Sequence, residues 1–168
     1  MLELVVWREL NRCRKENKTI KNFAWRLRKI SDKTPDNQAA KMKTLIELCG
    51  KSRFRSVWMN YYIQLPQTPV SEVDVLAEGE DGESCWALVF EIKNRGAKNP
   101  PEMKDAELFA EKVKKIKELL EQKGKKLCFV CPVYFSAEGF EKEIETWLHK
   151  QGILTADMET WEEDRKDI

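Results

Sequence analysis

The sequence lacks any long uninterrupted run of apolar residues. A helix that spans a bilayer needs roughly 20 consecutive, mainly apolar residues, and no segment of this 168-residue chain approaches that length. The apolar stretch 1–7 is followed at once by Arg8, so it is too short for the apolar core of a signal peptide. These absences predict a protein that is not inserted into a membrane and is located in the cytoplasm.

Histidine is almost absent, and cysteine is present without a clear metal pattern. A catalytic triad or a histidine-rich metal site cannot be built around the single His149 alone. The five cysteines are an odd number, and we expect them to be reduced thiols. Cys128 and Cys131 form a C-x-x-C motif, but zinc would need a second pair. Because the motif lies in the apolar run 127–135, which predicts a buried strand, packing is favoured over zinc or redox chemistry.

Aromatic and charged residues are abundant by contrast. Six tryptophans and seven phenylalanines lie in periodic apolar segments, which excludes disorder as the dominant state. Charged residues make up 35% of the chain, against a usual value of about 25%. Residues 1–33 carry a net charge of +6 and residues 157–168 a net charge of −4. The overall charge of +1 is therefore an average over unlike segments, and it does not exclude a nucleic-acid partner.

The spacing of apolar residues predicts one α/β domain between a basic and an acidic end. Residues 1–33 are expected to form a basic helical extension with helices at 2–16 and 20–31, and residues 157–168 an acidic tail. Residues 34–156 are expected to form a mixed sheet of about five strands flanked by helices. The expected order is helix 37–49, strands 57–65, 71–78 and 85–94, helix 102–123, strand 127–135, helix 138–150 and strand 153–158.

The most informative pattern is in the predicted hairpin between the second and third strands. A turn at 79–84, with an Asp-Gly dipeptide inside it, predicts antiparallel pairing that sets Asp74 opposite Glu91. Their Cβ atoms would then be roughly 4.5–5.5 Å apart. Because side chains alternate along a strand, Lys93 is expected on the same face as Glu91.

Two carboxylates at that distance repel each other unless a cation lies between them. Mg²⁺ prefers hard oxygen ligands such as carboxylates, water and phosphate oxygens. Asp74 and Glu91 therefore predict a divalent-cation site, with Lys93 placed to orient a water molecule or to stabilise negative charge. The alternative is an ordinary ion pair among these side chains at the sheet margin, because an E-x-K tripeptide alone often occurs by chance.

The stretches SEVDVLAE, with Asp74, and WALVFEIKNR, with Glu91 and Lys93, resemble the PD-(D/E)XK nuclease superfamily over about residues 36–156. The resemblance implies a restriction-endonuclease-like core. It also implies that Asp74, Glu91 and the carbonyl of Ile92 hold Mg²⁺, or Mn²⁺ as a substitute, and that Lys93 is catalytic. The function that it implies is hydrolysis of phosphodiester bonds, in DNA above all, by a metal-activated water.

The sequence departs from the family pattern at one position. Many members carry an additional glutamate on the helix before the first strand, whereas residues 37–41 contain no acid. Glu72 and Glu47 are the candidates to replace it. The alternative function is a catalytically inactive nuclease-like domain that binds nucleic acid or protein within a larger system.

A nuclease also needs cations that hold the phosphate backbone. Asn94, Arg95 and Lys98 follow the E-I-K tripeptide and are candidate phosphate contacts, with a solvated loop equally favoured. The lysines of 112–117 alternate with glutamates, which favours a solvated helix face over a DNA groove. The basic helices of residues 1–33 are the better candidates for nucleic acid, or for contact with a second copy of the chain or a partner domain.

Overall fold

The computed structural model describes residues 2–19, 47, 51–93 and 100–158. The predicted helices at 20–31 and, except for Glu47, at 37–49 lie outside the described residues, as do the boundary at residue 33 and nearly all of the acidic tail. No helix in the described part is both long enough and apolar enough to cross a bilayer. The elements are α1 (Leu2–Lys15), β1 (Phe54–Ile63), β2 (Ser71–Glu80), β3 (Ser84–Lys93), α4 (Met103–Glu121), β4 (Leu127–Ser136), α5 (Lys142–Lys150) and β5 (Leu154–Ala156).

The five strands form one mixed sheet in the order β1-β2-β3-β4-β5. β2 pairs antiparallel with β1 and β3, while β4 pairs parallel with β3 and β5. A parallel pair needs a long crossover, and α4 supplies it between β3 and β4. The predicted fold class, α/β with a mixed five-stranded sheet and flanking helices, is confirmed. α5 begins later than predicted because Gly139, with a φ of 83°, turns the chain back to the carbonyl of Ser136.

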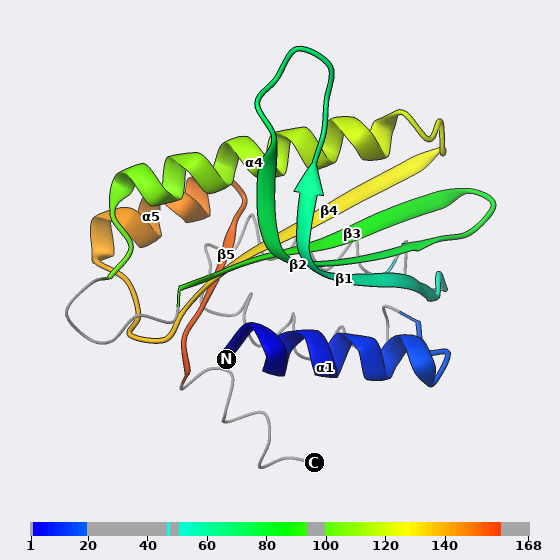
Figure 1. The fold of residues 1–168 in the computed structure, drawn as a ribbon, viewed down its shortest axis with the longest axis horizontal. Helices are drawn as coiled ribbons and strands as arrows, with labels where there is room; N and C mark the ends of the chain where they lie inside the picture. The colour runs from blue at the N-terminus through cyan, green and yellow to red at the C-terminus, as the bar shows by residue number, and fades with distance from the viewer. Residues whose placement is uncertain (1, 20–46, 48–50, 94–99, 159–168) are drawn as a thin grey trace.

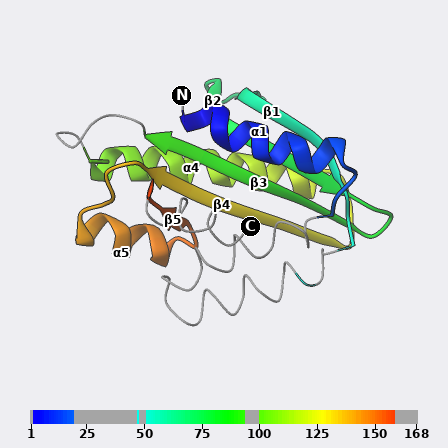
Figure 2. The ribbon, with the colours of Figure 1, turned by 90° about the horizontal axis from the view of Figure 1, so that it is seen from below.

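Helices cover both faces of the sheet (Figure 1), with α4 and α5 on one side and α1 on the other. The helical spacing of Leu2, Val6 and Leu10 makes one apolar stripe on α1, and all three are buried against the sheet. Figure 2 shows the same helix running beside β1. α1 is therefore a layer of the core, in addition to carrying part of the basic charge.

β3 lies at the centre of the sheet and is buried from both sides. Trp86, Leu88 and Phe90 belong to the cluster on the α1 side, whereas Ala87 and Val89 belong to the cluster under α4 and α5. A strand covered on both faces is expected to be apolar on both, as this one is up to Phe90. The charged residues that end β3 stand out against that pattern.

The three-residue turn 81–83 between β2 and β3 is held by the side chain of Asp81. Its carboxylate accepts hydrogen bonds from the hydroxyl of Ser52 at 2.7 Å and from the backbone N–H groups of Ser84 and Glu83 at 2.7 and 2.8 Å. These bonds hold the pKa of Asp81 well below its usual range. The turn is thereby fixed to the segment before β1, which favours a single hairpin register.

Candidate active site

The hairpin of β2 and β3 brings the predicted site residues to one end of the sheet. Its ladder ends at the pair Val75–Phe90 and has the register predicted from the turn. Asp74 and Glu91 come one step beyond that pair. The carboxylate Oδ2 of Asp74 accepts a hydrogen bond from the backbone N–H of Ile92 at 2.7 Å. Asp74 is thus tied to the backbone of β3 beside Glu91.

β1 is irregular at the same level of the sheet. Its ladder with β2 pairs Met59 with Val75 and Tyr61 with Val73, and it omits Asn60 and Asp74 between them. Asn60 has a φ of 54°, in the left-handed region that asparagine tolerates better than most residues. At this level the side chain of Asp74 adds a hydrogen bond to β3 just beyond the last pair of the β2–β3 ladder.

The three predicted catalytic residues, Asp74, Glu91 and Lys93, line one pocket of about 400 Å³. The backbone of Ile92, the further predicted ligand, lies between the last two. The walls come from α1, the sheet and the first turn of α4; the other lining residues are Glu3, Ile92, Asp105 and Tyr134. The candidate phosphate contacts Asn94, Arg95 and Lys98 lie outside the described residues.

Both charged side chains at the end of β3 have partners on α4. Lys93 Nζ donates a hydrogen bond to Asp105 Oδ2 at 2.8 Å. Lys112 Nζ donates to both carboxylate oxygens of Glu91, each at 3.2 Å. The ordinary ion pair among Asp74, Glu91 and Lys93, the alternative to a metal site, is therefore not the arrangement observed. The prediction of a solvated face for the lysines of 112–117 is wrong for Lys112, because its side chain reaches over the sheet to Glu91.

The start of α4 fixes the partner of Lys93. Asp105 lies in the first turn of the helix, where its Oδ2 also accepts the backbone N–H of Glu102 at 2.9 Å. Burial alone would raise the pKa of Asp105, but the hydrogen bonds from Lys93 and from Glu102 together hold it below its ordinary value. A carboxylate that stays ionised near a helix N-terminus is stabilised by the helix dipole, so Asp105 is a firm anchor for the ammonium of Lys93.

The two carboxylates on the strands, Asp74 and Glu91, both have raised pKa values. Burial raises the pKa of Asp74, and the hydrogen bond from Ile92 and the charge of Lys112 oppose that rise only in part. Burial and the negative charge of Asp74 raise the pKa of Glu91 to about 7, again against Lys112. Two partly buried carboxylates that share one opposing lysine favour the approach of a further cation.

The pocket has a further acid besides Asp74, Glu91 and Asp105, namely Glu3, which sequence reasoning missed. It lies in the first turn of α1, lines the pocket and adds to burial in raising the pKa of Asp74. The predicted candidates were Glu47 on the helix 37–49 and Glu72 on the strand 71–78, because the first helix was assigned to an extension. The signal that was available is an acid beside the apolar stripe of Leu2, Val6 and Leu10.

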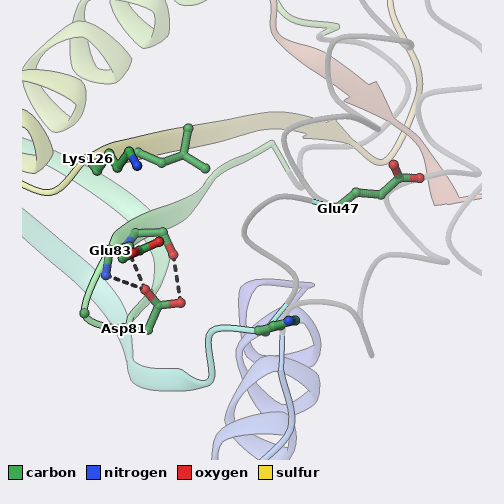
Figure 3. A pocket seen from close by; sticks show the side chains of 8 residues that line it. Glu47, Asp81, Glu83 and Lys126 are labelled. Atoms are coloured by element: carbon green, nitrogen blue, oxygen red, sulfur yellow. Dashed lines mark hydrogen bonds between the residues drawn. The ribbon is translucent and has the colours of Figure 1, made fainter.

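Neither Glu47 nor Glu72, the two acids predicted to complete the site, lines the pocket of Asp74. Glu47 is not at this site: it lines another pocket, at the opposite end of β3, together with Asp81 and Lys126 (Figure 3). Glu72, one of the first residues of β2, does not line the pocket of Asp74, although its charge adds to the rise in pKa of both Asp74 and Glu91. The helix 37–49 therefore does not supply a further carboxylate through Glu47.

The chemistry of these donors fits a hard divalent cation. Asp74, Glu91 and Glu3 present carboxylate oxygens to one polar pocket, and such oxygens are the ligands that Mg²⁺ prefers. Within the described residues, no three Asp, Glu, His or Cys side chains already have the spacing to close around an ion. Lys112 donates to both oxygens of Glu91, so a cation bound there would compete with that lysine for the carboxylate.

The sequence matches no protein-family model and no curated protein. Among solved structures, it is similar to a protein of unknown function, AF1548, with a TM-score of 0.44 and 21% identity over 75% of this chain and 64% of that chain. It is also similar to the MspJI restriction endonuclease in complex with a 27-mer oligonucleotide, with a TM-score of 0.37 and 10% identity. That match covers 94% of this chain and 30% of the endonuclease chain.

Proposed function

We propose that this chain is a Mg²⁺-dependent nuclease that hydrolyses phosphodiester bonds in DNA. The observation that carries the proposal is the meeting of Asp74, Glu91 and Lys93 in one pocket at the end of two neighbouring strands. The same three residues carry the resemblance to the PD-(D/E)XK superfamily. Their geometry therefore supports the chemistry that the motif implies.

Each residue of the pocket has a role in this proposal. Asp74, Glu91 and the carbonyl of Ile92 would hold the cation, with Glu3 as a further carboxylate donor. Mg²⁺ bound there would polarise the phosphate and lower the pKa of a coordinated water. Lys93, once it leaves Asp105, has an ammonium in the same pocket that can hold the attacking water or a phosphate oxygen.

Replacing Asp74 by asparagine tests the proposal directly. We expect the wild-type chain to nick plasmid DNA in Mg²⁺ or Mn²⁺ and to bind Mn²⁺ in calorimetry without DNA. Asp74→Asn should weaken Mn²⁺ binding by at least about 10- to 100-fold, the loss seen when a residue that only supports a metal ligand is replaced, and it should lose nicking. Glu78→Gln is the matched control, because Glu78 lies on the same strand outside the pocket and accepts a hydrogen bond from Ser56. Equal losses in both variants would contradict a site at Asp74.

The second candidate function, an inactive nuclease-like domain that binds nucleic acid or protein, is favoured by one observation. Glu91 and Lys93 are both held in ion pairs to α4, at 3.2 and 2.8 Å. A domain that no longer binds a cation would keep these pairs permanently. If the wild-type chain binds DNA or a protein partner but neither takes up Mn²⁺ nor nicks any nucleic acid, this second function replaces the first.

Lys112 and a bound cation are expected to compete for Glu91. The Lys112→Met variant should therefore bind Mn²⁺ more tightly, by about five- to tenfold. A partly exposed ion pair contributes roughly 1 kcal/mol, and that free energy corresponds to this change in affinity. The pKa of Glu91 is about 7 with Lys112 in place and rises when the lysine is absent, so calorimetry is done at pH 8.5 to favour the ionised carboxylate. Lys114→Met is the control, because Lys114 is exposed and pairs with Glu111 on its own helix. Weaker binding by Lys112→Met would show that this lysine supports the site instead of competing for it.

A further inference from the structure

Two cysteine side chains lie in contact at the other end of β3. Cys85 and Cys128 occupy directly paired positions of the parallel strands β3 and β4, and their Sγ atoms are 3.1 Å apart. Both thiols lie within 3.8 Å of the carbonyl oxygen of Leu120, near the end of α4. Cys85 is fully buried, whereas Cys128 is partly exposed. This pair joins two neighbouring strands on one face of the sheet, and the C-x-x-C spacing does not predict it.

The C-x-x-C motif itself does not form a site. Cys131 belongs to the apolar cluster on the α1 side, whereas Cys85 and Cys128 face α4. Residues three apart on a strand point to opposite faces, so Cys128 and Cys131 cannot share a ligand. Burial raises the pKa of the Cys131 thiol to about 12. Packing was predicted for both cysteines of the motif, and for Cys131 that prediction is confirmed.

The geometry of the pair fits a disulfide better than a metal site. Neighbouring strands place paired Cα atoms about 4.8 Å apart, within the 4.4–6.8 Å that disulfides span. In a tetrahedral metal site, two thiolate ligands lie at about 2.3 Å from the metal, and their sulfur atoms are then nearly 4 Å from each other. The observed 3.1 Å is shorter, and no third cysteine or histidine of the described residues joins the pair in a metal-binding group.

We propose that Cys85 and Cys128 are a dithiol site that peroxide oxidants convert to an intramolecular disulfide. The thiolate of Cys128, the accessible member, attacks one peroxide oxygen and becomes a sulfenic acid, with release of water or alcohol. The thiol of Cys85 then attacks the sulfur of Cys128, loses its proton and expels the sulfenic oxygen as water. Two thiols are oxidised, and one peroxide is reduced.

The bond would join the strand that carries the candidate active site to β4. Ten-residue β3 begins next to Cys85 and ends at Lys93, so the disulfide and the carboxylate pocket lie at opposite ends of one strand. The proposal does not depend on the proposed nuclease function, because its atoms lie outside that pocket.

The test is mild oxidation of the native, folded 168-residue chain. After removal of reductant, one equivalent of hydrogen peroxide should lower the intact mass by about 2 Da, the two hydrogens lost. Proteolysis without reductant should release a peptide that joins Cys85 to Cys128, and dithiothreitol should reverse both changes. In urea the same treatment should give a mixture of pairings, because the folded geometry that selects one pair is then absent.

Three variants separate this site from general thiol oxidation. Cys128→Ser and Cys85→Ala should each lose the 2 Da decrease, whereas Cys13→Ser, at a partly buried cysteine on α1, should keep it. Cys128→Ser alters a partly exposed side chain, so it tests the site even if the buried Cys85 does not tolerate change. A disulfide between other cysteines, a linked dimer, or sulfinic acid at Cys128 with Cys85 still reduced would overturn the proposal.

Discussion

Replacing Lys93 by methionine is expected to lower the rate of DNA cleavage by about 10²- to 10⁴-fold. Methionine keeps most of the length of the lysine side chain and removes the ammonium that, in the proposed mechanism, leaves Asp105 to hold the attacking water or a phosphate oxygen. The ion pair with Asp105 that is lost is partly exposed, with 21% of the Lys93 side chain accessible, and such pairs contribute less than about 1 kcal/mol. The variant should therefore fold, and it should bind Mn²⁺ as the wild type does.

The control for this change is Lys104→Met. Lys104 lies one residue before Asp105 on the same helix and is exposed, outside the pocket of Asp74. A rate constant for plasmid nicking, measured beside the unfolding temperature and Mn²⁺ affinity, distinguishes a chemical role from a structural one. Wild-type cleavage by Lys93→Met would remove Lys93 from the mechanism, and a loss of cleavage in Lys104→Met would indicate a general effect of charge on DNA binding.

Local sequence patterns were sufficient to predict the hairpin and its register. The Asp-Gly turn and the alternation of side chains are both short-range signals, and they placed the level of Asp74 beside that of Glu91. The hydrogen bond from Ile92 to Asp74 was not predictable in the same way. It joins a side chain to a backbone N–H just beyond the last pair of the β2–β3 ladder, at the level where Asn60 adopts a left-handed backbone.

The parts of the site that come from helices could not be predicted from periodicity. An apolar stripe shows that α1 buries one side, but it does not show which surface it covers, so Glu3 was not connected with Asp74. Lys112 alternates with acids, which looks like a solvated helix until the crossing of α4 over β3 is known. The contact of Cys85 with Cys128 likewise depends on the parallel pairing of two strands separated by a whole helix.

The second large effect expected is on stability, at Trp86. The indole is fully buried in β3 and packs edge-on against Phe54 with ring centroids 4.8 Å apart. Trp86→Ala should lower the free energy of unfolding by about 3–5 kcal/mol, the usual cost of removing a large aromatic side chain from a core. Trp86→Phe should cost much less, partly because the buried Trp86 Nε1 has no hydrogen-bond partner among the described residues and phenylalanine removes that unsatisfied group. Urea unfolding of the three proteins measures both differences.

The Gly79→Ala variant tests whether the indole ring of Trp86 is what requires glycine at residue 79. Gly79 pairs with Trp86 across the hairpin, and a Cβ at residue 79 would overlap both the indole ring and the backbone carbonyl of Arg53. Gly79→Ala should therefore destabilise the wild type by about 1–3 kcal/mol. In the Trp86→Ala background the methyl group enters the space that the ring leaves, so the same change should cost at least about 1 kcal/mol less. Equal costs in the two backgrounds would instead assign the requirement for glycine to the contact with Arg53, because that carbonyl remains in both.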